Sequence, residues 1–496
     1  MAEKAIPLPS TPAPELVRGL RLIDSTSIVV GSMIGSGIFI VSSDVARQVA
    51  SPGLLLLTWL LGFALTILCA VLYGELAAAL PHSGGQYVYL REAYGPLWGF
   101  LFGWTFFLVI QTGTIAAVAV AFAKFLGVLA PAISSTRMVL SFGQFHLPFV
   151  ERAFAAGVST QQLVAILSIV VLTALNCFGL RVGAIVQNLF TVTKTAALLG
   201  LALLGVFIGS NVAAISVNFT NFWRNADWGL STWTLLSVAL VGPLFAADAW
   251  NNVTFTGEEV QNPQRTLPLS MALGVGLVCL LYLLTNVAYL RVLPLEGSPA
   301  GAGPLERGIQ YALEDRVGTA AAQVIFGPLG TVLMAAAIMI STFGCNNGLI
   351  LAGARVYFAM ARDRLFFRAV ARVHPTYRTP VISLIVQGIW SCLLTLSGTY
   401  SQLLDYIIFA VLLFYMLTIG TLFVFRHKRP EMERSYRSWG YPVLPILYLL
   451  MAGFFEVNLL IYKPEYTWPG LMIVLLGVPV YYLWRRSAGS SDRLRA

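Results

Sequence analysis

The sequence predicts an all-α membrane protein that crosses the bilayer twelve times. Of its 496 residues, 57% are hydrophobic and only 11% are charged, whereas about a quarter of the residues in a soluble domain are charged. The mean hydropathy is +0.78. Because a soluble core of this length could not bury so much apolar surface, lipid must solvate much of the chain.

Twelve segments are apolar enough to be membrane spans, since a spanning helix needs about 20 mostly apolar residues. The runs are continuous and lack the short alternating segments of a membrane barrel, which favours helices. The expected spans cover residues 24–43, 53–80, 97–129, 160–178, 182–208, 231–257, 268–292, 328–361, 380–398, 402–426, 441–462 and 467–485.

The distribution of basic residues predicts that both termini lie in the cytoplasm. With that orientation, 20 of the 31 Lys and Arg fall in cytoplasmic segments and 8 in external ones, and cytoplasmic loops carry such an excess. We expect a protein of the cytoplasmic (inner) membrane, with one membrane domain over 21–485 and tails at 1–20 and 486–496. The external loops near 130–159 and 293–327 are expected to carry short surface helices.

Several classes of function are excluded by what the sequence lacks. The net charge of +9 comes largely from short loops, so nucleic-acid binding is not expected. The five cysteines have no CxxC spacing and the four histidines are scattered, so no metal site is expected. Neither a GxxxxGK[ST] motif nor a nucleophile elbow is present. We therefore expect neither an ATP-driven pump core, nor an enzyme, nor a cofactor.

The first span is interrupted near its middle by Gly31, Gly35 and Gly37, with two serines between them. Glycine weakens a helix and permits unusual backbone angles. An unwound stretch at mid-membrane has to line a polar cavity, and the N–H groups at a half-helix N-terminus form a natural carboxylate site. The alternative is a close helix–helix contact, because small residues at this spacing also pack spans together.

The sixth span is interrupted as well. Gly242 and Pro243 disrupt its helix, and Asp248 brings a carboxylate into the membrane. The two broken spans occupy corresponding positions in two runs of five, which is the pattern of an inverted repeat with a substrate site at its interface. We expect repeat one over about residues 24–208, repeat two over about 231–426, and two extra helices over about 441–485.

Ionisable and hydroxyl side chains within spans are further candidates, because such groups usually face a cavity or a partner. Lys194, near the middle of the fifth span, could replace a sodium ion, carry a proton, or be a structural cation bound by carbonyls. Asp248 could meet a charged substrate side chain or a fixed polar partner. Ser341 and Thr342 could bond back to their own helix or meet Lys194 and the unwound first span.

Three acidic residues lie near the inner ends of spans. Glu75, in the second span, is expected to be a structural partner of loop groups. Glu258 and Glu259 end the sixth span; they could form gating ion pairs, and solvation is the favoured interpretation.

Four stretches of the sequence carry a resemblance to a known family. They are Gly31–Phe39, Tyr73–Tyr87, Phe245–Glu259 followed by Asn262-Pro263, and Arg355–Asp363 followed by Thr379-Pro380. With these stretches the chain resembles the amino acid–polyamine–organocation (APC) superfamily, and within it the L-type amino acid transporter family, over nearly its whole length. The resemblance implies a LeuT-type fold of five plus five inverted helices with two more, and transport of amino acids by alternating access.

The resemblance also implies roles for individual residues. The substrate carboxylate would meet the amides of the glycine segment, the substrate ammonium would meet carbonyls near Met33 and Phe245, and the Phe245 ring would close over the occupied site. The implied substrate-binding residues are Met33, Gly35, Ser36, Gly37, Phe245, Ala246 and Asp248.

The same resemblance places Lys194 between the first and eighth spans, near Ser341 and Thr342, in place of a sodium ion. Two features depart from the family. Many L-type members have glycine where this chain has Asp248, and aspartate occurs there in relatives that accept cationic amino acids, but also in others. Animal members link by disulfide to a single-span glycoprotein through a cysteine after span three, and the 129–159 loop has no cysteine, so no such partner is expected.

The sequence therefore predicts a membrane transporter that exchanges neutral L-amino acids without sodium. Proton-coupled symport, or antiport of cationic amino acids or polyamines, are the alternatives within transport. A membrane sensor that binds amino acids without moving them is the alternative outside it, and the short tails argue against a signalling role. The oligomeric state is left open.

Overall fold

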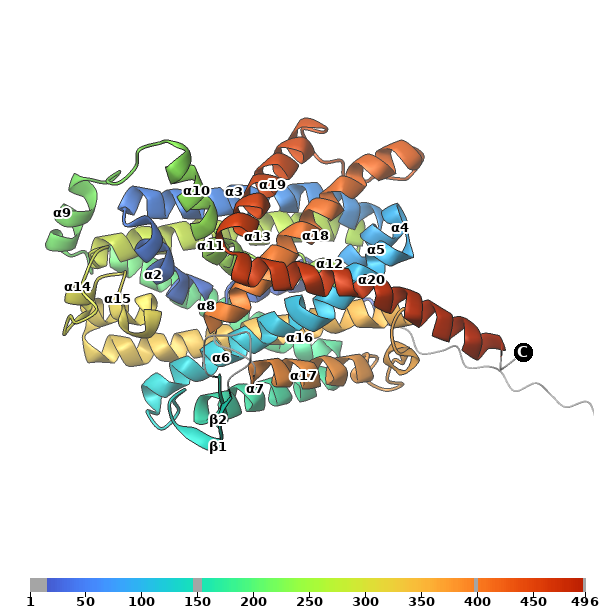
Figure 1. Cartoon of the computed structure of the whole chain (residues 1–496), viewed down its shortest axis with the longest axis horizontal. Helices are drawn as coiled ribbons and strands as arrows, with labels where there is room; N and C mark the ends of the chain where they lie inside the picture. Colours follow the sequence, from blue (N-terminus) through green and yellow to red (C-terminus); the bar gives the residue numbers. More distant parts are fainter. Residues whose placement is uncertain (1–15, 146–153, 397–399, 494–496) are drawn as a thin grey trace, which may run out of the picture.

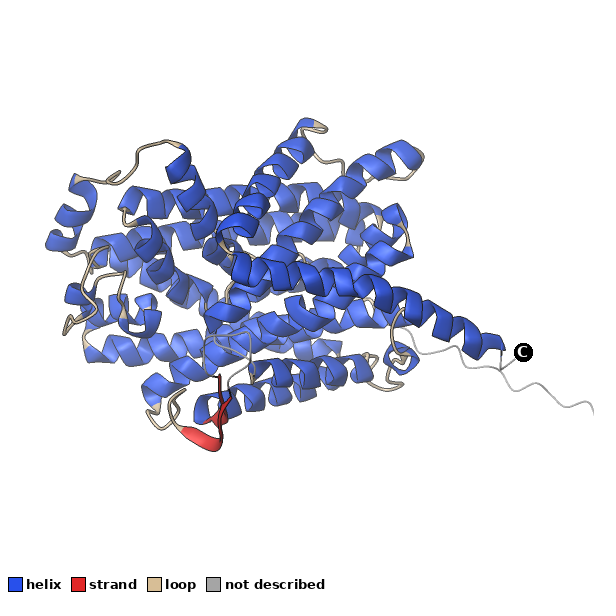
Figure 2. Cartoon of the chain, viewed as in Figure 1, coloured by secondary structure: helices blue, strands red, loops and turns tan. Residues whose placement is uncertain are grey.

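The computed structural model describes residues 16–145, 154–396 and 400–493, and helices make up most of it (Figure 2). Within these residues, ten helices are long and apolar enough to cross a membrane. The predicted all-α polytopic class is thereby confirmed. The number of twelve spans is not, because two predicted spans correspond to shorter apolar helices in the described part of the chain, Leu230–Ala246 and Val381–Thr395.

Several long helices, among them α3, α13, α16 and α17, run roughly along the long axis of the molecule, whereas α18 and α19 run at a slant to it (Figure 1). In the first half of the chain the elements are α1 (Leu22–Met33), α2 (Gly37–Val49), α3 (Pro52–Ala79), α4 (Gln86–Tyr94), α5 (Pro96–Thr105), a π-helical turn (Phe106–Ile110), α6 (Gln111–Leu129), β1 (Met138–Phe145), β2 (Phe154–Ser159), α7 (Thr160–Cys177), α8 (Leu180–Phe207) and α9 (Val212–Thr220). In the second half they are α10 (Leu230–Ala239), α11 (Val241–Ala246), α12 (Asn252–Phe255), α13 (Pro263–Val292), α14 (Pro304–Arg307), α15 (Val317–Phe326), α16 (Pro328–Arg362), α17 (Val381–Thr395), α18 (Tyr400–Lys428), α19 (Val443–Tyr462) and α20 (Pro464–Arg493).

The two loops that were predicted to be external differ from each other. The loop before α16 carries the short helices α14 and α15, as predicted. In the loop after α6, the described residues form two antiparallel strands, β1 and β2, and no helix, while 146–153 lie outside the described residues. The run Met138-Val-Leu-Ser-Phe contains a β-branched and an aromatic residue, and such residues favour a strand.

Both spans predicted to be broken are interrupted, but the second break lies after Gly242 and Pro243, which are part of a helix. Helix α1 ends at Met33, Ile34 adopts an extended conformation (φ −75°, ψ 90°), and α2 restarts at Gly37. Helix α11 ends at Ala246, and the chain stays non-helical until Asn252, with Ala249 at a left-handed φ of 66°. We call these two segments the first break and the second break.

The helices around the breaks also touch each other closely. A Cβ atom added at Gly37 would lie 2.6 Å from Ala246 Cβ, and one added at Gly242 would lie 2.3 Å from Val41 Cγ1. Only glycine fits at such a distance. The first span is therefore both broken and in close helix–helix contact, and Gly37 and Gly242 allow α2 to approach α11.

Helices α19 and α20 lie outside this centre. Helix α19 packs on α18, α10 and α3, and α20 packs on α5 and α18. Their outer faces expose large apolar side chains such as Leu450 and Leu483, as expected for helices that face lipid. This agrees with their predicted place as peripheral additions.

At the end of the helix bundle where α4 lies, acidic side chains form ion pairs with arginines. Glu75 accepts hydrogen bonds from Arg426, at 3.0 and 2.6 Å, and from Ser438 of the following loop, which confirms its predicted role. The expectation that Glu259 is solvated is wrong. Its side chain is fully buried and accepts two hydrogen bonds, of 3.0 and 2.9 Å, from the equally buried Arg355 of α16.

Candidate functional site

The first break leaves a cluster of backbone carbonyls at the C-terminal end of α1. A helix end carries carbonyls without intrahelical donors and a partial negative charge. The N–H of Gly35 bends back to donate to the Met33 carbonyl, at 2.9 Å. The hydroxyl of Tyr282 in α13 donates to the same carbonyl, also at 2.9 Å. The Met33 carbonyl therefore already accepts two hydrogen bonds.

Lys194 of α8 enters this carbonyl cluster. Its side chain is 1% exposed, and its ammonium donates to the carbonyls of Gly31, of Ile34 at 2.7 Å, and of Ser341 in α16 at 3.3 Å. The ammonium thus joins the first break to α8 and α16 through three oxygens. A positive charge at a helix C-terminus is electrostatically favourable, and a set of backbone carbonyls is also what holds a sodium ion in broken-helix transporters.

Ser341 and Thr342 are neighbours in sequence, yet the structure uses them differently. The Ser341 hydroxyl donates to the carbonyls of Ile34 and Gly35, both at 3.1 Å. The Thr342 hydroxyl donates at 2.9 Å to the Ile338 carbonyl of its own helix. Ser341 therefore belongs to the first break, whereas Thr342 follows the alternative in which a hydroxyl bonds back to its helix.

Two further residues of α8 that the sequence analysis did not select also hold α1. Gln187 and Thr191 both donate to the Ser27 carbonyl, at 3.3 and 3.1 Å. Together with Lys194 they stand at intervals of four and three residues, which places them on one face of a helix. That spacing of polar residues in an apolar segment is the sequence feature that could have identified them.

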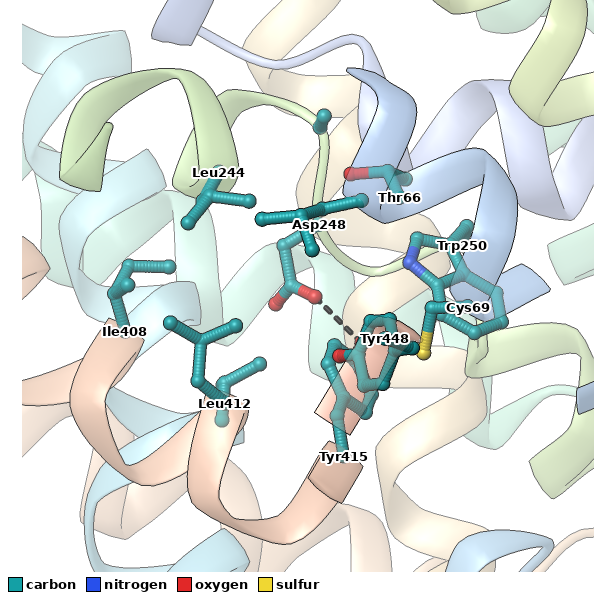
Figure 3. A pocket seen from close by; sticks show the side chains of 12 residues that line it. Thr66, Cys69, Leu244, Asp248, Trp250, Ile408, Leu412, Tyr415 and Tyr448 are labelled. Carbon is teal, nitrogen blue, oxygen red and sulfur yellow. Dashed lines mark hydrogen bonds between the residues drawn. The ribbon is translucent and has the colours of Figure 1, made fainter. Parts of the chain in front are cut away.

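Around the second break the structure has cavities. One small cavity lies between α3, the second break, α18 and α19, and is lined by Asp248, Tyr415 and Tyr448 among others (Figure 3). A second small cavity is lined by Asp248, Asn251 and Tyr415, and by residues around the π-helical turn. Asp248 and Tyr415 line both.

Asp248 has a fixed polar partner. Its Oδ1 accepts a hydrogen bond of 2.6 Å from the Tyr415 hydroxyl of α18 (Figure 3). The structure therefore shows one of the two alternatives for Asp248, a polar partner within the bundle. The carboxylate still borders both cavities, so the other alternative, contact with a substrate side chain, is not excluded by its position.

The predicted substrate-binding residues fall into two groups. Met33, Gly35, Ser36 and Gly37 lie in or beside the first break, and Phe245, Ala246 and Asp248 lie in or beside the second. The two groups approach each other where Gly37 packs against Ala246. Asp248 lines the two cavities around the second break, and the other six, all among the described residues, line neither.

Comparison with known proteins decides the family. Residues 20–482 match the model of a family described as amino acid permease. The chain belongs to this family. The permease is similar to the serine/threonine exchanger SteT of Bacillus subtilis, with 28% identity covering 96% of this chain and 98% of that protein.

Two human proteins are similar as well. One is the b(0,+)-type amino acid transporter 1, which is 30% identical over 97% of this chain and 91% of that protein. The other is the large neutral amino acids transporter small subunit 2, which is 30% identical over 94% of this chain and 80% of that protein. These matches confirm the predicted resemblance to the APC superfamily and its L-type members. The chain is a multi-pass membrane permease, not an enzyme.

Proposed function

We propose that this permease exchanges neutral L-amino acids across the cytoplasmic membrane, by alternating access and without sodium. The observation that carries the proposal is the buried Lys194 ammonium among the carbonyls of Gly31, Ile34 and Ser341. A cation fixed by covalent attachment at this position takes the place that a sodium ion could occupy, so the site needs no sodium to hold the first break. The names of the relatives, one an exchanger and one a transporter of neutral amino acids, support the choice of exchange and of substrate.

The substrate carboxylate is proposed to bind at the N-terminal end of α2. The N–H groups of Gly37 and Ile38, in its first turn, have no acceptor within the helix, and a helix N-terminus favours an anion. The Gly35 N–H already donates to Met33. We therefore place the carboxylate at Ser36 and Gly37 and assign Gly35 chiefly to the bend.

The substrate ammonium is proposed to approach the carbonyls near Met33 and Phe245, under the Phe245 ring. Since the Met33 carbonyl accepts from Gly35 and Tyr282, the ammonium has to compete with one of these donors. This competition links substrate binding to the shape of the first break. If the substrate ammonium took the place of the Gly35 N–H at the Met33 carbonyl, the bend itself would change.

Cationic amino acids are the second candidate substrates, and Asp248 is the observation that favours them. Its carboxylate borders both cavities and could receive a substrate ammonium or guanidinium in place of the Tyr415 hydroxyl. We rank them second because the hydrogen bond from Tyr415 already satisfies one carboxylate oxygen. Polyamine antiport and proton-coupled symport are weaker alternatives within the same fold.

The orientation and assembly are also part of the proposal. We place the α4 end and both termini in the cytoplasm, in line with the positive-inside rule, and treat residues 21–485 as one domain of two inverted repeats and two extra helices. No disulfide-linked partner is proposed, since the loop between α6 and α7 has no cysteine.

The test is uptake of radiolabelled L-leucine, L-serine and L-lysine into proteoliposomes, with and without unlabelled amino acid inside, at equal and at unequal pH. Uptake that requires internal amino acid and favours leucine or serine supports the proposal. Uptake into empty vesicles that follows the pH gradient would replace exchange by proton symport. Binding without any uptake would favour a sensor.

A further inference from the structure

Helix α19 carries a buried carboxyl group that the site described above does not use. Glu456 lies two-thirds of the way along α19 and is only 5% exposed. It sits on the inward stripe of the helix with Tyr448, Ala452 and Leu459. The large apolar residues on the other side of α19 are exposed, as lipid-facing residues are.

Glu456 differs from the other acidic groups inside the bundle. Glu75 and Glu259 are paired with arginine, and Asp248 accepts from Tyr415. Among the described residues, no side chain forms a hydrogen bond or an ion pair with Glu456. The group lies against the backbone of Leu413 in α18, in the middle of a helix where the N–H groups are already used.

A charged carboxylate is not stable in such a place. Removing an ionised carboxylate from water without a partner is costly, and in practice the group becomes neutral instead. No cation interacts with Glu456 among the residues that the structure describes. The neutral acid is therefore the form that fits this conformation.

Ionisable groups on the surrounding helices do not supply a counter-charge. Helix α10 has none. The others on the described helices that pack against α19 are Cys69, Tyr73 and Glu75 of α3; Tyr415, Arg426, His427 and Lys428 of α18; and Glu465, Tyr481, Tyr482, Arg485 and Arg486 of α20. On α19 itself, Tyr448 interacts electrostatically with Glu456, and Lys463 follows the helix end. The basic residues of α18 and α20 lie in or near the last turns of those helices, far along the chain from Leu413.

The position of Glu456 connects it to the cavities. Glu456 lies against Leu413 of α18. The cavity around Asp248 is lined by the neighbouring α18 residues Val411, Leu412 and Tyr415. Tyr448, on the same stripe as Glu456, lines that cavity too. A change of charge at Glu456 would therefore act on the turn of α18 that forms the cavity wall.

We propose that Glu456 is a proton-binding site of the permease, protonated in this conformation, whose deprotonation displaces α18 and slows transport. The proton comes from water and returns to it, and no other reactant is needed. The inference rests on the proposed function only for the transport readout, because the protonation itself is measured on the purified protein.

The first experiment compares the infrared spectra of the purified wild-type protein and E456Q at neutral pH. We expect the wild type to show the carbonyl band of a protonated carboxylic acid, and we expect E456Q to lack this band. The control E465Q, which removes an exposed acid at the start of α20, should retain it. Should E456Q not fold, E456D shifts the same band. Identical spectra of wild type and the Glu456 variants in this region would overturn the proposal.

The second experiment measures exchange of L-leucine in proteoliposomes as the pH on both sides is raised together from mildly acidic to alkaline. The wild type and E465Q are expected to slow by about threefold or more, because the deprotonated form no longer fits this conformation, while E456Q stays nearly constant. An E456Q profile that follows the wild type would overturn the proposal. If the wild type exchanges no leucine at all, the proposed function fails, and the infrared comparison still decides Glu456.

Discussion

The two breaks at the centre of the bundle are built in opposite ways. At the first break, side chains from α8, α13 and α16 saturate the backbone carbonyls, and the charged group is a lysine. At the second break, the charged group is an aspartate with a single tyrosine partner, and it borders two cavities. The difference suggests a division of labour, in which the first break holds helices in place through the cycle and the second meets the part of the substrate that varies.

The largest expected effect comes from removing the cation of the first break. In Lys194→Ala three buried carbonyls lose a charged donor, and hydrogen bonds to charged groups are worth about 1.5–3 kcal/mol each. We expect L-leucine exchange in proteoliposomes to fall by about a hundredfold, a factor of ten being about 1.4 kcal/mol. Lys124→Ala, which removes a lysine near the C-terminal end of α6, is the matched control and should retain most activity. An equal loss of L-leucine exchange in both variants would contradict a special role for Lys194 at the first break.

The contact between the two breaks can be tested by adding one methyl group. In Gly37→Ala the new Cβ would meet Ala246 Cβ at 2.6 Å, while in Gly276→Ala it would meet nothing within 4 Å. Overpacking costs about 1–3 kcal/mol, so we expect exchange to fall about tenfold in the first variant and to be unchanged in the second. The thermal unfolding of both variants is measured in parallel. Normal exchange by Gly37→Ala would show that α2 and α11 need not approach so closely.

The second break is tested through selectivity. Tyr415→Phe removes the donor to Asp248 and frees its oxygen, and a neutral hydrogen bond is worth about 1 kcal/mol. The ratio of L-lysine to L-leucine uptake should rise about fivefold, whereas Asp248→Gly should lower it. Tyr448→Phe, in the wall of the same cavity, is the control for a lost hydroxyl. A ratio that none of these variants changes would mean that Asp248 does not meet the substrate side chain.

The smallest effect separates two adjacent hydroxyls. Ser341→Ala removes donors to the Ile34 and Gly35 carbonyls, and a loss of about 1 kcal/mol corresponds to about a fivefold slower exchange. Thr342→Ala removes only a bond within α16 and should change exchange by less than about twofold. The reverse order in measured exchange rates would contradict the arrangement of the first break.

Features with a local cause could be predicted from the sequence. Glycines disfavour a helix wherever the helix packs, so the first break was predicted at the glycines where it occurs. The second was predicted in the correct span but at Gly242 and Pro243, which lie within α11, whereas the chain leaves the helix after Ala246. Lys194 was recognised because an ammonium within an apolar span is costly and needs oxygen partners. The same logic, applied to the spacing of Gln187, Thr191 and Lys194, would have predicted a whole face of α8 that holds α1.

Features that depend on long-range packing could not be predicted in this way. Glu259 and Arg355 are 96 residues apart, and Asp248 and Tyr415 are 167 apart. Each of these groups alone is compatible with solvent, with a cavity or with a partner, and only the packed helices decide. The choice between Ser341 and Thr342 was also undetermined, because it depends on which side of α16 faces the first break.

The central claim is that Lys194 does at the first break what a sodium ion could do. It is tested most directly by the initial rate of L-leucine uptake into leucine-loaded proteoliposomes, measured for the wild type in sodium chloride and in choline chloride. Equal rates in the two media are predicted, because the carbonyls of Gly31, Ile34 and Ser341 are occupied by the ammonium. Uptake that requires sodium, or that sodium strongly accelerates, would contradict the claim.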